Sequence, residues 1–331
     1  MTDRTDNAVL RAEAQLDRAS AWRIWEIAIW VVAIAAIFAL PGKSLILAEI
    51  AILALFAISL DLILGYAGVV SLGHAAFFGI GAYTAGIFSK YVWGEPVTGL
   101  LVAAVVAGVF GFATSFIVAR FRHLTLIMIT LGIGLIAHEF ANRAHWLTGG
   151  SDSLQGISIG KVLGIFRFDL YGYTAYTYSL ILLFVIFLAA RRLVHSPFGL
   201  ALRGIRENWV RMPAIGADSQ AHIRKAYTIA AIIAGMAGAA LTQTTQTAAL
   251  GSISFERSAD VLVMLVLGGA GRLYGGLIGA AIFMIARDQF SGIAPQFWFF
   301  WIGLLLVGVV MFLPNGVLGG LSDLYARWRR K

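Results

Sequence analysis

The sequence predicts an all-α integral membrane protein with about ten transmembrane or half-spanning helices and both termini in the cytoplasm. Three observations support this fold class: the composition, the series of long apolar stretches, and the distribution of lysine and arginine. Hydrophobic residues make up 60% of the chain and charged residues 13%, whereas soluble domains carry about 25% charged residues. The mean hydropathy of +0.84 agrees. A soluble fold is therefore excluded. Because the chain contains no cysteine, disulfides and thiolate metal sites are excluded as well.

Ten apolar stretches approach the roughly 20 residues that a helix needs to cross the hydrocarbon core of a bilayer. They lie at residues 24–40, 45–64, 72–89, 98–119, 124–141, 174–190, 226–248, 258–270, 273–290 and 296–313. The stretch 258–270 is too short for a full crossing, so we interpret it as a candidate half of a re-entrant hairpin. The first stretch lacks a convincing cleavage site after it, and we interpret it as an uncleaved anchor.

Lysine and arginine are unevenly distributed among the segments that join these stretches. With both termini inside, 18 of the 25 basic residues fall in cytoplasmic segments, as the positive-inside rule requires. The predicted organisation is a cytoplasmic segment 1–23, a transmembrane domain 24–320 with an external loop 142–173 and a cytoplasmic loop 191–225, and a basic cytoplasmic tail 321–331. The net charge of +8 then reflects topology and contact with anionic membrane lipid, and no nucleic-acid partner is expected.

The stretch from Asp61 to Gly86, DLILGYAGVVSLGHAAFFGIGAYTAG, is apolar enough for a bilayer yet is interrupted by glycines and polar side chains. Irregular backbone at membrane depth persists only where protein or a water-filled cavity satisfies it, and polar side chains there are costly. The stretch therefore indicates a solute path. Its candidate residues are Asp61, Gly65, Gly68, Ser71, Gly73 and His74. For the glycines, close packing of helices through small residues is the competing explanation.

The cytoplasmic loop contains a predicted amphipathic helix. Ser196 and Pro197 fit an N-cap and a first helical position, and Pro213 prevents extension much beyond Met212. At the helical period the apolar residues gather on one face and the charged residues on the other. The apolar face contains Phe198, Ala201, Leu202, Ile205, Trp209 and Met212, and the charged face contains Arg203, Arg206, Glu207 and Arg211. We expect this helix to lie along the membrane surface with its charges toward the cytosol.

A glycine cluster, GGAGRLYGG, follows at residues 268–276. Its composition predicts a tight cytoplasmic turn, and its spacing does not match a phosphate-binding P-loop. The residues assigned to this turn are Gly268, Gly269, Gly271, Arg272 and Gly275.

Two enzyme motifs are present only in incomplete form. Ile37 stands where a Walker A motif ending at Ser44 requires its first glycine. Asn142 replaces the second histidine of the HExxH pattern that begins at His138, so an intramembrane zinc site lacks a ligand. The chain is therefore not expected to be an enzyme or to bind a metal.

Three segments together resemble one known family. They are LDLILGYAGVVSLGHAAFFGIGAYTAG from Leu60, SPFGLALRGIRENWVRMPAIGAD from Ser196, and GGAGRLYGGLIGA from Gly268. In this order they are similar to the M-type permease subunit of branched-chain amino acid ABC importers, and the resemblance extends from about residue 45 to residue 320. It implies a bacterial inner-membrane permease that works by alternating access. The implied partners are a sister permease in a heterodimer, two cytoplasmic ATPase subunits and a periplasmic substrate-binding protein.

The resemblance also assigns a role to the cytoplasmic loop. Its helix is similar to a coupling helix that enters a groove on the ATPase, with Arg203 and Arg206 offering charge to the ATPase surface. The residues carried over to this role are Phe198, Gly199, Arg203, Arg206, Glu207, Ala214 and Gly216. ATP and Mg²⁺ would be bound by the partner ATPase subunits, and no cofactor by this chain.

Two alternatives stay open from the sequence. Relatives of similar sequence carry urea, short amides or aromatic carboxylates, so a branched-chain amino acid is only the first expectation for the solute. The chain is also compatible with a stand-alone secondary transporter, in which Asp61, Glu139 and His74 would relay an ion or proton. A requirement for ATPase subunits and ATP would separate these two classes.

Overall fold

The computed structural model describes residues 24–320, apart from 41, 170, 294 and 314, so the predicted segments 1–23 and 321–331 lie outside the described residues. In the described part, every regular element is a helix, which confirms the all-α class. Two isolated β-bridges, Leu154 to Ala248 and Val162 to Phe166, join loop residues.

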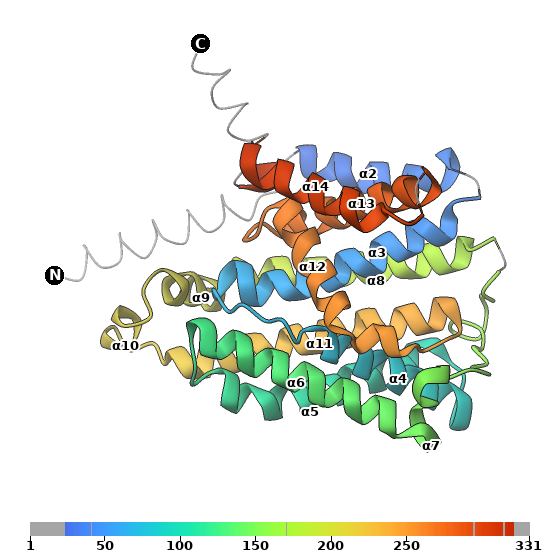
Figure 1. Cartoon of the computed structure of the whole chain (residues 1–331), viewed down its shortest axis with the longest axis horizontal. Helices are drawn as coiled ribbons and strands as arrows, with labels where there is room; N and C mark the ends of the chain where they lie inside the picture. Colours follow the sequence, from blue (N-terminus) through green and yellow to red (C-terminus); the bar gives the residue numbers. More distant parts are fainter. Residues whose placement is uncertain (1–23, 41, 170, 294, 314, 321–331) are drawn as a thin grey trace, which may run out of the picture.

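The helices run mostly along one common direction, with α9 and α10 at one end of the bundle and α7 at the other (Figure 1). Their bounds are α2 (Ile24–Ala39), α3 (Ser44–Asp61), η1 (Leu62–Tyr66), α4 (Ala75–Tyr91), α5 (Pro96–Val118), α6 (His123–Arg143), α7 (His145–Thr148), η2 (Gly150–Asp152), α8 (Tyr173–Val194), α9 (Pro197–Glu207), α10 (Arg211–Ala214), α11 (Ser219–Thr245), η3 (Leu250–Ile253), α12 (Phe255–Gly268), α13 (Leu273–Ile293) and α14 (Trp298–Phe312).

A helix occupies each of the ten predicted ranges, but ten membrane spans are not confirmed. Six of the described helical segments are long and apolar enough to cross a membrane, or seven if the bent pair α12 and α13 is one span. The number of candidate spans is lower than the number of predicted stretches partly because two of the helices are short. Helix α2 has 16 residues and α4 has 17, and at 1.5 Å per residue neither reaches across a core about 30 Å thick.

The pair α12 and α13 has the geometry expected of a broken span or a re-entrant hairpin. The two helices meet at an angle of 113° over a short break, and α12 crosses the bundle steeply in Figure 1. Gly269 and Gly271 in the break have φ angles of +106° and +81°, a region that side chains disfavour. The tight turn predicted for this glycine cluster is therefore observed.

The core is centred on α3 and α11, the most deeply buried of the long helices. Helix α11 presents small residues such as Ala230, Ala234 and Gly238 to its neighbours, and these alanines are fully buried. Its backbone lies close to α4, since a side chain at Gly238 would meet the carbonyl of Phe78. Small residues that permit close approach are the usual means of packing helices in lipid.

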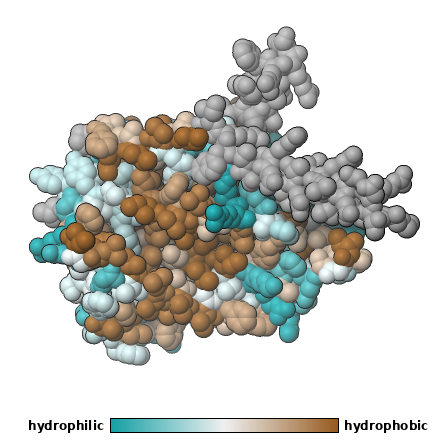
Figure 2. Space-filling model, turned by 180° about the vertical axis from the view of Figure 1, so that it is seen from behind, coloured by the Kyte–Doolittle hydropathy of each residue, from teal (hydrophilic) through white to brown (hydrophobic). Residues whose placement is uncertain are grey.

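The outer surface is apolar around the middle of the bundle. Figure 2 shows hydrophobic residues gathered in a broad band across one face, with hydrophilic residues toward both ends. Helix α5 contributes exposed Val105, Val109 and Phe112, and α6 is the least buried of the candidate spans. This distribution is typical of a multi-pass membrane protein, in which lipid covers the apolar band.

Candidate coupling and transport site

The polar, glycine-containing stretch interrupts the helices as predicted. Helix α3 ends in the π-helical turn η1, the chain then continues without helix from residue 67 to residue 74, and α4 begins at Ala75. Gly68 in this segment has a φ angle of +71°. The helix expected from residue 72 therefore starts slightly later, because the chain remains irregular through His74.

Side chains from other helices satisfy the backbone of this irregular segment. The N–H of Leu72 donates to Thr130 Oγ1 of α6 at 3.2 Å, and the N–H of Ala75 donates to Ser258 Oγ of α12 at 2.9 Å. Such internal partners are what irregular backbone requires at membrane depth. A crevice of about 10 Å³ beside Gly73 is at the lower limit for one water molecule, so this crevice is too small for an amino acid in this conformation.

His74 lies in a fully buried pocket between α3 and α4. Its Nε2 is 2.8 Å from Ser59 Oγ, and its ring stacks on Phe56 with centroids 5.5 Å apart. The Ser59 hydroxyl donates to the carbonyl of Phe56 at 2.6 Å, so it accepts from His74. Nε2 therefore carries the proton, and Nδ1 is left buried without a partner. Ser71 is also buried.

Asp61 brings two of the three sequence motifs together. Its fully buried carboxylate accepts the backbone N–H of Gly271 at 2.6 Å, which joins the end of α3 to the turn between α12 and α13. One helical turn further along the chain, the carbonyl of Gly65 accepts a hydrogen bond from Arg206 Nη1 of α9. We call these four residues, Asp61, Gly65, Gly271 and Arg206, the junction.

The two glycines of the junction are required by the closeness of its backbones. A side chain at Gly65 would overlap the Asp61 carboxylate and the Gly271 nitrogen. A side chain at Gly271 would lie 3.0 Å from Arg206 Nη1 and 3.1 Å from the Gly65 oxygen, at a positive φ angle. The junction is therefore a three-way contact of α3, α9 and the glycine turn that tolerates no added methyl group at Gly65.

The helix predicted in the loop 191–225 is amphipathic as predicted but shorter. Leu202 and Ile205 are buried on its apolar face, with exposed fractions of 1% and 2%. The single helix expected up to Met212 is wrong, because α9 ends at Glu207 and Asn208 is extended. The Asn208 side chain accepts the N–H groups of Val210 and Arg211, at 3.1 and 3.0 Å, and so starts the separate turn α10.

Side chains of this loop contact three other parts of the bundle. Arg203 lies over the ring of Tyr66 at 5.2 Å, and Arg122, between α5 and α6, lies over the ring of Trp209 at 3.4 Å. Phe198 stacks on His222 at the start of α11, with centroids 5.6 Å apart. The loop therefore contacts η1, the connection between α5 and α6, and the start of α11.

The outer surface of the loop is exposed and carries both charged and apolar side chains. Its exposed residues include Glu207, Arg211, Ala214 and Gly216, whereas Gly199 is buried where α9 turns against the end of α8. At the end of the loop, the N–H of Ala221 donates to Asp218 at 3.0 Å and holds the pKa of that carboxyl below its usual range. Asp218 thereby acts as the N-cap of α11.

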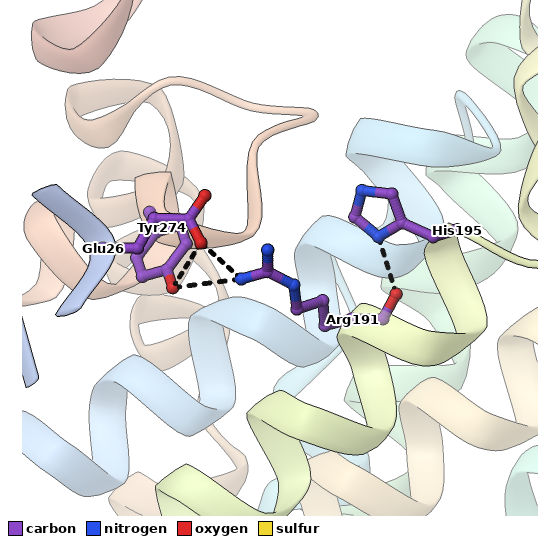
Figure 3. Close-up of polar contacts among 4 residues, drawn as sticks. All are labelled: Glu26, Arg191, His195 and Tyr274. Atoms are coloured by element: carbon purple, nitrogen blue, oxygen red, sulfur yellow. Dashed lines mark hydrogen bonds and ion pairs between the residues drawn. The ribbon is translucent and has the colours of Figure 1, made fainter. Parts of the chain in front are cut away.

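A buried ion pair that was not predicted lies at the same end of the bundle. Arg191 Nη1 of α8 is 2.5 Å from Glu26 Oε2 of α2, and Tyr274 Oη of α13 is 3.4 Å from the same carboxylate (Figure 3). His195, one turn after Arg191, bonds the Arg191 carbonyl through Nδ1 at 2.8 Å. The available signal was Glu26, a charged residue inside the apolar stretch 24–40, since such residues usually pair.

The structure thus unites part of the predicted set. Asp61 and Gly65 of the proposed path meet Arg206 of the coupling set and Gly271 of the glycine turn. His74 instead contacts Ser59 and Phe56. Among the described residues no group of three or more histidine, cysteine, aspartate or glutamate residues is placed to hold a metal ion.

Comparison with known proteins identifies the family. The family model for the branched-chain amino acid transport system permease component matches residues 44–314, a range that includes the broken segment, the loop and the glycine turn. The chain belongs to this permease family.

Individual relatives agree with this family. The chain is 25% identical over 318 residues to the high-affinity branched-chain amino acid transport system permease protein LivM of Escherichia coli, covering 89% of this chain and 75% of the relative. It is 24% identical over 326 residues to a probable branched-chain amino acid transport permease protein LivM of Methanocaldococcus jannaschii, covering 83% and 92%. No solved structure matches the chain. The described chain is therefore a multi-pass membrane permease component, and its relatives are not enzymes.

Proposed function

We propose that this permease is one transmembrane subunit of an ATP-driven importer in the bacterial inner membrane. It would form a heterodimer with a sister permease, with two cytoplasmic ATPase subunits that bind ATP and Mg²⁺ and a periplasmic protein that delivers the solute. The names of the relatives support branched-chain amino acids as that solute. This chain would supply part of the path and the contact with an ATPase, and would bind no cofactor itself.

The observation that carries this proposal is the junction. Arg206 of α9 bonds the backbone of Gly65, and Asp61, one turn before Gly65, bonds the backbone of Gly271. A displacement of α9 therefore acts directly on the end of α3 and on the hinge between α12 and α13. A stand-alone transporter does not require an exposed loop that is hydrogen-bonded to its broken helices.

The proposed orientation places α9 and α10 in the cytoplasm. The start of α2, the end of α8 and the start of α13 meet at that end of the bundle through Glu26, Arg191 and Tyr274. The first described helix therefore begins on the side of the loop, which supports a cytoplasmic N-terminus. The concentration of basic residues in 191–225 supports the same orientation under the positive-inside rule.

Alternating access would follow from unequal binding of ATP to two conformations. Closure of the ATPase subunits would move α9 and α10, and the junction would transmit this movement to α3 and α13. In the conformation described, Asp61, Ser71 and His74 are buried and the crevice beside Gly73 is narrow. A path along Asp61, Gly65, Gly68, Ser71, Gly73 and His74 would open only when α4 and α6 separate at the break.

Reconstitution in proteoliposomes tests the proposal. The permease, sister permease, ATPase subunits and binding protein are combined, and uptake of labelled leucine, isoleucine and valine is measured with and without ATP. Uptake that needs all four components and ATP is the expected result. Uptake by this chain alone on an ion gradient would overturn it in favour of a secondary transporter. ATP-dependent uptake of labelled urea, a short amide or an aromatic carboxylate, with no uptake of the branched-chain amino acids, would retain the importer and change the solute.

A further inference from the structure

A groove of about 420 Å³ lies where α5, α8, α9 and α11 meet, at the end of the bundle that carries the cytoplasmic loop. Its walls are almost entirely apolar except for two cations. Phe112, Leu193, Phe198 and Ile229 line the apolar walls, and Arg224 and Lys225 line the groove from α11. None of the candidate path residues lines this groove.

The groove continues the lipid-facing surface of α5. Phe112 is 52% exposed and belongs to the same apolar face as Val105 and Val109. Phe116, one turn further along α5, lies 5.1 Å from the Arg224 guanidinium. The apolar walls therefore open toward the hydrocarbon side of the helix, while the cations lie at its cytoplasmic end.

The two cations leave a positive charge that is not neutralised nearby. Among the described residues, the ion pairs do not include Arg224 or Lys225. Asp218 acts electrostatically on Arg224, but its carboxylate already accepts the N–H of Ala221 as the cap of α11. One partly engaged carboxylate against two cations makes the rim of the groove a site for an anion.

We propose that this groove binds one anionic phospholipid of the cytoplasmic leaflet. Its acyl chain would lie against Phe112, Leu193 and Ile229, and its phosphate would bind Arg224 and Lys225. Cations at the membrane surface attract anionic lipids in this way, and the apolar walls with two cations beside them match the acyl chain and phosphate of such a lipid. The assignment of the leaflet rests on the proposed cytoplasmic orientation of α9.

The position of the lipid gives it a role in coupling. Phe198, near the start of α9, forms one wall of the groove and stacks on His222 of α11. A lipid chain in the groove would support α9 against α11 in the conformation described. Anionic lipid would thus favour this position of the coupling helix, and its removal would loosen the helix.

Native mass spectrometry of the purified permease, with its partner subunits bound, tests this site without relying on transport. After delipidation, phosphatidylglycerol or phosphatidylcholine is added and bound lipid is counted. We expect one tightly bound phosphatidylglycerol. The double variant Arg224→Ala with Lys225→Ala should bind it roughly 30-fold more weakly, the factor for two cations at about 1 kcal/mol each.

Two controls keep the test specific. The variant Lys161→Ala with Arg167→Ala removes the same charge from the exposed loop before α8 and should bind as the wild type does. The variant Arg224→Lys with Lys225→Arg keeps the charge and should restore binding if the alanine variant assembles poorly. Equal binding of the two lipids, an unchanged alanine variant, or crosslinking of a cysteine at Phe112 to the sister permease would each overturn the proposal.

Discussion

The backbone N–H of Gly271 donates a 2.6 Å hydrogen bond to the carboxylate of Asp61, across 210 positions of sequence. The bond joins the end of α3 to the hinge of the α12 and α13 hairpin. One turn further, Gly65 accepts from Arg206 of α9. Two neighbouring hydrogen bonds therefore connect two broken membrane elements with the 191–225 loop at the junction.

Replacing Asp61 by alanine should destabilise the permease. The substitution leaves the Gly271 N–H without its acceptor, a loss of about 1–3 kcal/mol for a buried group. Asp61→Asn keeps an acceptor oxygen and should lose less. The measurement is the midpoint of thermal unfolding in detergent. As a control, Asp288→Asn removes an exposed partner of Lys43 and should change stability by at most about 1 kcal/mol. Equal midpoints for wild type and Asp61→Ala would contradict this account of the bond.

Gly65→Ala should damage coupling as well as stability. The added methyl group overlaps Asp61 and Gly271, and overpacking of this kind costs about 1–3 kcal/mol. We expect a lower unfolding midpoint and loss of ATP-driven uptake. Gly132→Ala is the matched control, since no atom outside its own stretch of helix backbone lies within 4 Å of the position its methyl group would take. A Gly65→Ala permease that transports as well as Gly132→Ala would show that the close approach is not needed.

The sequence predicted the helical class, the interruption after Asp61 and the amphipathic loop helix, because each depends on local pattern. It also predicted that Asp61, Gly271 and Arg206 matter, but in three separate roles. Their meeting was not predictable, since it depends on how α3, α9 and α13 pack. Ten membrane spans are not confirmed, because hydropathy locates apolar stretches without fixing the length of the helix that each one forms. The hairpin expected at 258–270 agrees with the 113° bend between α12 and α13.

The break at Asn208 was missed for a different reason. Helical periodicity continues through Trp209 and Met212, so the pattern predicts one helix. A local side-chain bond from Asn208 to the following N–H groups competes with that helix, as asparagine commonly does. Periodicity alone does not report such a bond.

The pair of Glu26 and Arg191 should be sensitive to single substitutions and tolerant of a paired one. Arg191→Met leaves Glu26 buried without its cation, which costs about 3–5 kcal/mol when a buried pair is broken. Glu26→Leu combined with Arg191→Met removes both charges and should recover most of the lost stability. The unfolding midpoints of the two single variants and the double variant measure this. A double variant less stable than either single variant would contradict the pairing.

Glu207→Lys should weaken ATPase docking without affecting membrane insertion. Glu207 is exposed at the end of α9, so its replacement does not disturb the core, while it reverses a charge on the proposed docking surface. The amount of ATPase that co-purifies with the permease measures docking. Asp152→Lys makes the same charge change on the loop 142–173, which is predicted to be external and where Asp152 is also exposed, and should leave the amount unchanged. Co-purification of Glu207→Lys at the wild-type level would remove Glu207 from the docking surface.

Sidedness and protection of the cytoplasmic loop test the central proposal most directly. The chain has no cysteine, so single cysteines introduced as Arg211→Cys and Asp152→Cys report their positions with no competing thiol. With a membrane-impermeant maleimide, Asp152→Cys should react in right-side-out vesicles and Arg211→Cys only in inside-out vesicles. Bound ATPase should then protect Arg211→Cys from the reagent. Reaction of Arg211→Cys from the periplasmic side, or equal reaction with and without the ATPase, would contradict a coupling role for α9 and α10.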